Sequence, residues 1–269
     1  MLNGVLAVIF ATALVLWQPP ALAETIKLRV PDVSTTDYVV ELVTSALEKT
    51  GRQVEFERID ADFNMARQMK LFETGDGLDL IWRGESPDLK QEYLEVDVDI
   101  TDGLKGYRVM LIHPRDRDLY KGVASLEEFQ AIGTVAALGA GWNDVDVWQQ
   151  NDLKLQEFKG VWNPEIYHLI ALGGRGVDYF PRGITEIAGE AALHPDLLIE
   201  PHLGLVYAND FRFYVTKENA ELHALLTQAL KQAEQDGTLL EILKRANPDV
   251  YDPDKINIDG RTIIPLSMP

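Results

Sequence analysis

The sequence predicts an α/β fold, and three observations carry the prediction. Short runs of alternating polar and apolar residues, typical of strands, follow one another with helix-patterned runs between them. No second long apolar run follows residues 1–23, so we expect a soluble chain of one large domain or two lobes. The chain has no cysteine, and a core of this size does not need disulfides. Because strands and helices alternate, a largely parallel sheet is favoured, with ligands beyond the carboxyl ends of its strands.

Residues 1–23 predict a signal peptide. They contain no Asp, Glu, Lys or Arg, and the run from Gly4 to Trp17 is almost wholly apolar. The small-x-small triplet at residues 21–23 then offers a cleavage site before Glu24. The apolar run is shorter than the roughly 20 residues that cross a bilayer, although an uncleaved N-terminal anchor is the alternative. We therefore expect a periplasmic protein that is not embedded in the membrane after cleavage.

The first half of the mature chain follows the strand and helix patterns closely. The loop at residues 31–36 holds several N-cap candidates, and Gly51 ends the helix that follows it. The loops at 31–36 and 82–88 follow strands, so ligand contacts are expected there first. The patterns predict strands over residues 25–30, 53–59, 78–82 and 107–112, and helices over residues 38–49 and 63–73.

The second half continues the alternation. Ser125 begins a short helix, and a glycine-containing loop at 139–142 precedes a helix that begins near Asn143. The tail from Asn247 is rich in Pro and Asp, and we expect it to wrap over the surface. The remaining patterns predict strands over residues 131–138 and 211–215, a strand reaching 180, a helix over 165–172, and two helices over 219–245 interrupted near 236–237.

Charge and composition exclude several classes of function. The formal net charge of −18 argues against nucleic acid and anionic membranes, which bind basic surfaces. Without cysteine there is no thiol nucleophile and no thiolate metal site. The five histidines fit no zinc spacing, and no serine lies in Gly-x-Ser-x-Gly. We therefore expect no catalytic residue, no metal and no cofactor, and a protein that is a monomer.

Four segments together resemble the family 3 extracytoplasmic solute-binding proteins, the receptors of polar amino-acid import systems. The last of the four is the most specific, and the resemblance covers most of residues 24–245. The sequence resembles one subgroup of periplasmic receptors more closely. The shared features are a Gly-Tyr-Arg strand at 106–108 and the stretch DYFPRG at 178–183. The four segments are GLDLI at 77–81, SLEEF at 125–129 before IGTV at 132–135, LGGRGVDY at 172–179, and YVTKENAEL at 214–222 with the following AL and DGT.

The resemblance implies a periplasmic-binding-protein type II fold, with two mixed sheets flanked by helices and a cleft between two lobes. Lobe 1 is expected to comprise residues 24–113 and 206–269, and lobe 2 residues 114–205, with crossings near 112–115 and 205–209. The implied function is capture of a small polar solute, amino acid-like or anionic, by hinge closure for ABC-type uptake. Two alternatives are a sensor or orphan binding module that feeds a signalling protein, and a dehydratase-type enzyme on the same fold.

The predicted ligand site departs from the family pattern at two positions. The family's carboxylate-binding Arg falls on Lys90, with Arg83 nearby, and Arg182 stands where an Asp would hold a ligand amine. Such a cleft favours an anionic or planar solute. The structural alternatives are a core role for Trp82, an ion pair of Arg182 with Glu186 or Glu190, and structural roles for Arg108 and Asp178. The predicted ligand-binding residues are Asp32, Trp82, Arg83, Ser86, Lys90, Trp142, Asn143 and Arg182.

Overall fold

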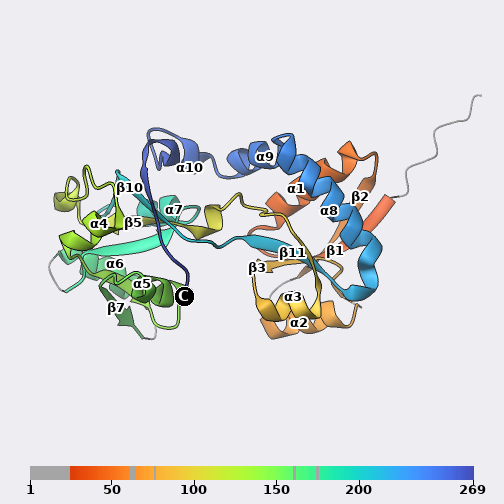
Figure 1. Ribbon diagram of the computed structural model, residues 1–269, viewed down its shortest axis with the longest axis horizontal. Coiled ribbons are helices and arrows are strands. Elements are labelled where there is room, and N and C mark those ends of the chain that lie inside the picture. The colour runs from red at the N-terminus through yellow and green to blue at the C-terminus, as the bar shows by residue number, and fades with distance from the viewer. Residues whose placement is uncertain (1–24, 61–64, 76, 160–161, 174–175) are drawn as a thin grey trace, which may run out of the picture.

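The computed structural model shows two α/β lobes side by side along the long axis, joined by a few connections (Figure 1). It describes residues 25–60, 65–75, 77–159, 162–173 and 176–269. The predicted signal peptide at residues 1–23 lies outside this part. Within the described residues, no helix has both the length and the apolar character needed to cross a bilayer.

The first lobe contains two small sheets covered by helices. Strand β1 (Thr25–Asp32) pairs in parallel with β2 (Gln53–Asp60). Strands β3 (Ile81–Gly84) and β4 (Leu94–Val96) pair antiparallel with β11 (Phe211–Val215), in the order β3-β11-β4. The helices of this lobe are α1 (Thr36–Lys49), α2 (Met65–Glu73), α3 (Pro87–Glu92), α8 (Ala220–Gln235) and α9 (Thr238–Ala246).

An ion pair joins these two sheets. The backbone N–H of Arg29 in β1 and its guanidinium donate hydrogen bonds of 2.6–2.9 Å to the carboxylate of Asp79, which precedes β3. The Asp79 N–H in turn donates to the Arg29 carbonyl at 2.9 Å. Partial burial works to raise the pKa of Asp79, but the bonds from Arg29 outweigh it and hold the pKa below its usual value. The aspartate of the GLDLI segment therefore fixes β3 beside β1.

The core of the first lobe follows from two periodicities. Along α1 the buried apolar residues recur at three and four positions, which places them on one helix face. Along the β3–β11 pair, Trp82 lies opposite Phe213 and Arg83 opposite Arg212, so apolar and basic pairs alternate between the two faces. The α1 residues that pack in this core are Val39, Leu42, Val43, Ala46 and Leu47.

The second lobe is built on one large mixed sheet, in the order β12-β10-β5-β8-β6-β7, with β9 on β5. Strand β6 is parallel to its neighbours, whereas β5 is antiparallel to β8 and β10, so the expectation of a largely parallel sheet is wrong and that of mixed sheets is confirmed. Its strands are β5 (Tyr107–Ile112), β6 (Ala136–Gly139), β7 (Leu155–Phe158), β8 (Tyr179–Gly183), β9 (Leu198–Ile199), β10 (Leu203–Val206) and β12 (Thr262–Pro265). Its helices are α4 (Leu126–Ile132), α5 (Asn143–Gln150), α6 (Trp162–Leu172), α7 (Ile187–Leu193) and α10 (Pro248–Tyr251).

Helix α4 shows why one predicted strand begins too early. Its N-cap is Ser125, whose hydroxyl accepts a hydrogen bond from the Glu128 N–H at 3.2 Å. The helix continues to Ile132 and ends at Gly133, which has a left-handed φ of 79°. The strand predicted over 131–138 therefore begins only at Ala136.

The sheet pairing corrects the predicted boundary between the lobes. Residues 107–113 were assigned to lobe 1, but β5 pairs with β8, β9 and β10 inside the second-lobe sheet. The first crossing therefore lies between β4 and β5, over residues 97–106, rather than near 112–115. The second crossing runs between β10 and β11, over residues 207–210.

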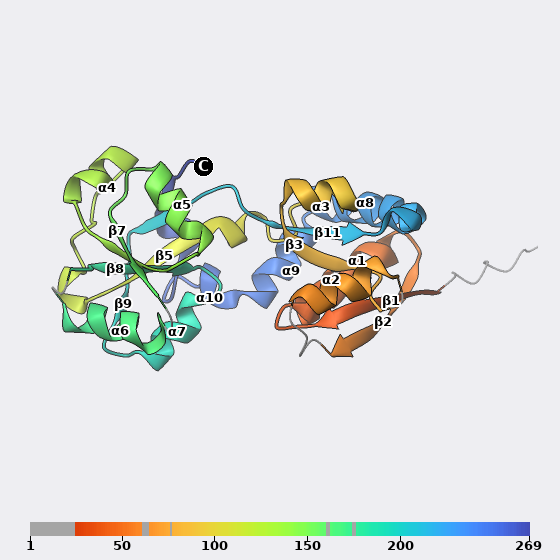
Figure 2. The same cartoon turned by 90° about the horizontal axis from the view of Figure 1, so that it is seen from below.

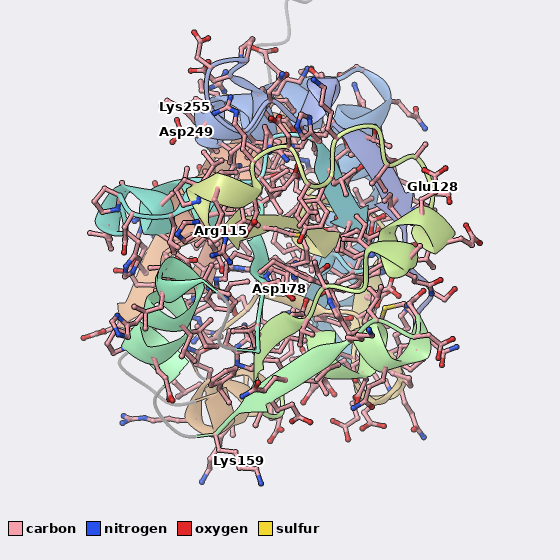
Figure 3. All side chains as sticks on the ribbon, turned by 90° about the vertical axis from the view of Figure 1, so that its left-hand side faces the viewer. Arg115, Glu128, Lys159, Asp178, Asp249 and Lys255 are labelled. Atoms are coloured by element: carbon pink, nitrogen blue, oxygen red, sulfur yellow. The ribbon has the colours of Figure 1, made fainter. Side chains whose placement is uncertain are left out.

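The C-terminal tail makes a third crossing and belongs to the second lobe. After α9, which packs on α1, the chain continues through α10 and pairs β12 in parallel with β10 (Figure 1). On the way Lys255 forms an ion pair with Asp249 (Figure 3). The prediction that the tail wraps over the surface is wrong for β12, whose Ile264 is buried in the core.

A buried ion pair fixes the tail. The Arg261 guanidinium donates to the carbonyls of Glu200, Leu203 and Ile256 at 2.6–2.8 Å and lies 3.6 Å from the Glu200 carboxylate. The two side chains are 2% and 0% exposed. Glu200 also accepts hydrogen bonds from the N–H groups of His202 and Leu203. Burial raises the pKa of Glu200, with these bonds and Arg261 acting against it.

We predict that Arg261→Met destabilises the fold by about 3–5 kcal/mol, because it leaves a buried carboxylate without its cation. A carboxylate with a raised folded-state pKa is least destabilising in its protonated form, so the deficit should shrink as the pH falls from 8 toward 5. Urea unfolding at several pH values measures both effects. The control is Arg245→Met, which removes exposed pairs with Glu41 and Glu241 and should leave the midpoint unchanged. Equal effects of the two variants would contradict the prediction.

Candidate functional site

The first two crossing segments are bound to each other at Asp210. Its carboxylate is 4% exposed and accepts hydrogen bonds from the Thr101 N–H and hydroxyl at 2.9 and 2.8 Å, and from the Gly103 N–H at 2.6 Å. Burial raises the pKa of Asp210, and the bonds from Gly103 and Thr101 counteract it. Figure 2 shows the two connections running together between the lobes. Asp210 therefore joins the crossings into one hinge.

Close backbone contact reinforces this hinge. The Tyr207 N–H donates to the Gly106 carbonyl at 3.3 Å, and a Cβ atom on Gly106 would lie 2.0 Å from the Tyr207 carbonyl oxygen. Only glycine permits this approach. The GYR pattern at 106–108 thus has a structural reason for its first residue.

The ends of the first lobe that adjoin the hinge are the two predicted ligand loops. The Tyr38 hydroxyl, in the first turn of α1, donates to the carbonyl of Ile100 in the first crossing. At the end of β3, a Cβ on Gly84 would lie 3.6 Å from the side-chain oxygen of Asn209 in the second crossing. The loops after β1 and β3 therefore both lie beside the crossings.

On the second lobe, the start of α5 adjoins the same hinge. Arg108 Nε donates to Asp144 Oδ1 at 2.6 Å, and the Tyr207 hydroxyl donates to the same oxygen at 2.9 Å. The Arg108 guanidinium also donates to the Tyr207 hydroxyl. The predicted structural ion pair of Arg108 is confirmed, and it fixes the first turn of α5 to the second crossing.

Arg182 lies in a neighbouring network of aromatic and acidic groups. Its guanidinium forms ion pairs with Glu190 at 2.6 Å and Glu186 at 2.9 Å. It also lies 5.2 Å from the Trp142 ring and 5.1 Å from the Phe180 ring, at cation–π distance. The alternative that Arg182 pairs with these two glutamates is confirmed. The structural alternative for Asp178 also holds, because its carboxylate accepts the Val135 N–H at 2.8 Å.

Two of the predicted residues on β3 differ in their environment. Trp82 is 3% exposed in the first-lobe core, and its indole N–H donates to the Thr35 hydroxyl at 2.8 Å. Trp82 therefore has the core role that was the alternative to ligand binding, and it also holds the loop after β1 through this hydrogen bond. Arg83 donates to the Gln68 side chain and to the Trp82 carbonyl, and among the described residues it forms no ion pair. Its buried Nε has no hydrogen-bond partner there either, and burial lowers its pKa. Arg83 thus carries a positive charge that no carboxylate of the described residues pairs with.

The other predicted residues lie at or near the surface. Lys90 is exposed and forms ion pairs with Glu95 at 3.1 Å and Glu85 at 3.4 Å. Ser86 precedes α3 without a side-chain cap bond, and Asp32 is exposed at the end of β1. Asn143 is exposed at the start of α5.

The predicted site residues form two groups rather than one. Trp142, Asn143 and Arg182 lie together on the second lobe, and the other five lie on the first. The sequence did not predict the hinge residues Asp210, Asp144 and Tyr207. The signal for Tyr207 and Asp210 was their place in or next to the predicted crossing at 205–209, whereas Asp144, at the start of α5, had no such signal.

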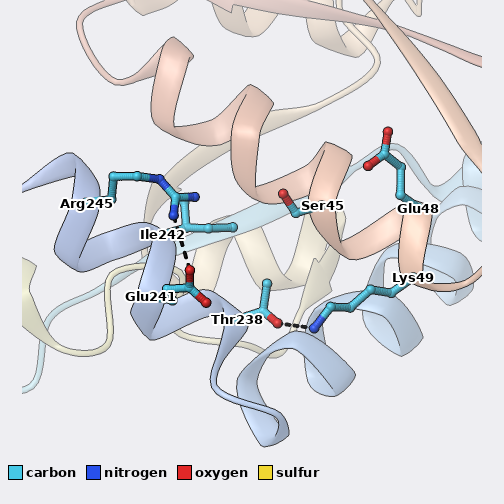
Figure 4. Close-up of a pocket in the computed structure, with 7 residues that line it drawn as sticks. All are labelled: Ser45, Glu48, Lys49, Thr238, Glu241, Ile242 and Arg245. Atoms are coloured by element: carbon cyan, nitrogen blue, oxygen red, sulfur yellow. Dashed lines mark hydrogen bonds and ion pairs between the residues drawn. The ribbon is translucent and has the colours of Figure 1, made fainter.

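A shallow groove of about 450 Å³ lies elsewhere, between α1 and α9 on the first lobe (Figure 4). Its basic residues are already paired, Lys49 with Asp236 and Arg245 with Glu41. It contains none of the predicted ligand-binding residues. Ser45, Glu48, Lys49, Thr238, Glu241, Ile242 and Arg245 line it.

No protein-family model matches the sequence, and no curated protein matches it. Solved structures match it in fold. The second substrate-binding domain of a protein described as an amino acid ABC transporter of Streptococcus pneumoniae gives a TM-score of 0.58 at 14% identity, over 82% of this chain and 99% of that one. Substrate-binding domain 2 of Lactococcus lactis GlnP, in its open conformation, gives 0.56 at 11% identity, over 86% and 97%. An ancestral cyclohexadienyl dehydratase gives 0.51 at 17% identity, over 82% and 92%. The predicted two-lobed type II periplasmic-binding-protein fold is confirmed.

We predict that Gly106→Ala destabilises the protein by about 1–3 kcal/mol, because the added methyl group forces the crossings apart. The matched control is Gly189→Ala in α7, where no atom lies within 4 Å of the new Cβ and the higher helix propensity of alanine should stabilise by up to about 1 kcal/mol. Thermal unfolding compares the two. A Gly106→Ala protein as stable as the wild type would show that the contact does not hold the hinge.

We predict that Arg182→Ala lowers stability by roughly 1.5–3 kcal/mol, the scale of charge-assisted hydrogen bonds, since Glu186 and Glu190 then repel each other without a cation. Denaturant unfolding measures the loss. The double variant Arg182→Ala/Glu190→Ala should recover part of it. Unchanged stability of the single variant would return Arg182 to the ligand-binding role.

Proposed function

We propose that this protein is an extracytoplasmic solute-binding protein, which captures a small polar solute between its lobes by hinge closure and delivers it for ABC-type uptake. The observation that carries the proposal is the hinge: two lobes with sheets of their own, joined by crossings that Asp210 holds together. Two structures of similar fold are substrate-binding domains, one of them in an open conformation.

Solute binding and hinge closure are coupled through the contacts that the solute makes with each lobe. A solute that bridges both lobes favours the closed state by the difference between its interactions in the two states. The groups that we propose for the first lobe are Asp32, Arg83 and Ser86, and those for the second lobe are Trp142 and Asn143. Trp82, Lys90 and Arg182 are engaged by other residues, and in this proposal they hold the loops in position.

We propose binding without catalysis. An ancestral dehydratase has the same fold, so a dehydratase is the second candidate, and incubation with a bound solute followed by mass spectrometry separates the two. Conversion of the solute to a product would establish the enzyme. A sensor that feeds a signalling protein would bind the solute in the same way and differ only in its membrane partner.

The proposal is tested by a thermal-shift screen of residues 24–269 against amino acids and organic acids. A solute at 100 times its Kd should stabilise the protein by about 2.7 kcal/mol. X-ray scattering with that solute should show a smaller radius of gyration, because the lobes close. Stabilisation without compaction would contradict hinge closure, and no stabilisation by any compound would contradict binding.

Arg83→Ala should lower the affinity for that solute by a factor of about 10–150, equivalent to roughly 1.5–3 kcal/mol. Isothermal titration calorimetry measures the change. Arg245→Ala is the control, because it removes a half-exposed arginine of the same lobe whose partners, Glu41 and Glu241, lie outside the proposed site. Unchanged affinity in Arg83→Ala would remove Arg83 from the site.

A further inference from the structure

Lys105 is a cation at the hinge that forms no ion pair with a carboxylate of the described residues. It lies in the short 3-10 helix Leu104–Gly106, the last part of the first crossing. Its ammonium lies 4.8 Å from the ring centre of Phe211, the first residue of β11. Among the described residues it makes no ion pair and no side-chain hydrogen bond.

The groups that surround Lys105 come from both lobes. Phe211 belongs to the first-lobe sheet, whereas Asp144 and Glu186, which act electrostatically on the ammonium, lie at the starts of α5 and α7 in the second lobe. Asp210 in the second crossing acts on it as well. The ammonium therefore lies where the lobes meet, next to the crossings.

Each of these carboxylates is occupied by a partner other than Lys105. Arg108 and Tyr207 bind Asp144, Arg182 binds Glu186, and Thr101 and Gly103 bind Asp210. Burial lowers the pKa of Lys105, and the positive charge of Arg108 adds to this. The charged form of such a partly desolvated ammonium is stabilised when an anion binds next to it, because a charge-assisted hydrogen bond replaces lost hydration.

We propose that Lys105 binds an oxyanion of the solute, a carboxylate or a phosphate, at the hinge between the two lobes. The inference rests on the proposed solute-binding function and gives its solute class, a small anion. The Phe211 ring covers one side of the ammonium, so the solute would contact another side of it. Its position on a crossing makes the contact available to both lobes.

The test measures binding of succinate, L-glutamate, inorganic phosphate, L-glutamine and L-arginine to the wild type and three variants by calorimetry. At least one of the three anions should bind the wild type more tightly than L-arginine does. Lys105→Met should lower the affinity for that anion by about 10–100-fold. Lys105→Arg should lower it by less than about 5-fold, because the positive charge is retained. Succinate and phosphate separate a carboxylate site from a phosphate site.

The matched control is Lys244→Met, because the Lys244 ammonium also lies over an aromatic ring, 5.0 Å from the centre of Tyr251, but on α9. It should leave the affinity unchanged. A second readout is acetylation of the wild type by acetic anhydride, followed by mass spectrometry: the bound anion should slow the reaction at Lys105 and not at Lys244.

The outcomes separate the inference from the function on which it rests. Equal anion affinity in Lys105→Met and wild type, or no protection of Lys105, would overturn the inference and leave solute binding intact. Binding of L-glutamine or L-arginine alone, with an affinity that Lys105→Met leaves unchanged, would do the same. If none of the five compounds binds, the proposed function fails and the inference fails with it.

Discussion

The hydrogen bonds that Asp210 accepts from the adjacent crossing are the constraint on which the two-lobed arrangement depends. A buried carboxylate is expensive to leave without donors, so the segments that carry Asp210, Thr101 and Gly103 have to stay together. Glycine at 106 lets the backbones approach closely enough for this. The hinge closure proposed above would turn about these residues, and the loops beside them would move least.

The acidic composition of the chain has a structural counterpart around the hinge. Basic side chains there are largely committed to carboxylates, Arg108 to Asp144 and Arg182 to Glu186 and Glu190. Such pairs set the geometry of helix starts and strand ends rather than supplying charge for a solute. In an acidic protein the informative cations are those without such a partner, and Arg83 and Lys105 are the ones that the site contains among the described residues.

Local pattern was enough to predict most helices and several strands, because α1, β1 and the α8–α9 break at Gly237 are determined by residues next to one another. The assignment of β5 failed because its apolar run fits a buried strand of either lobe, and only long-range pairing with β8 and β10 decides. Strand β12 was missed because its few residues follow a Pro- and Asp-rich stretch. For the proposed site, residue type made Arg83 and Arg182 equal candidates, and only the fold of α7 behind Arg182 showed that Glu186 and Glu190 pair with it. Lys105 has no motif at all, and only its position on a crossing singles it out.

The third crossing has a consequence for the order in which the lobes form. Strand β12 completes one edge of the second-lobe sheet, yet it is synthesised after α8 and α9 of the first lobe. Until β12 is synthesised, the second lobe therefore has an unpaired β10 edge. Its Glu200 carboxylate also lacks the Arg261 guanidinium until then. Open strand edges are where chains pair wrongly. A nascent chain that stalled before β12 would expose the β10 edge, so completion of the tail, rather than of either central sheet, is the step that covers β10.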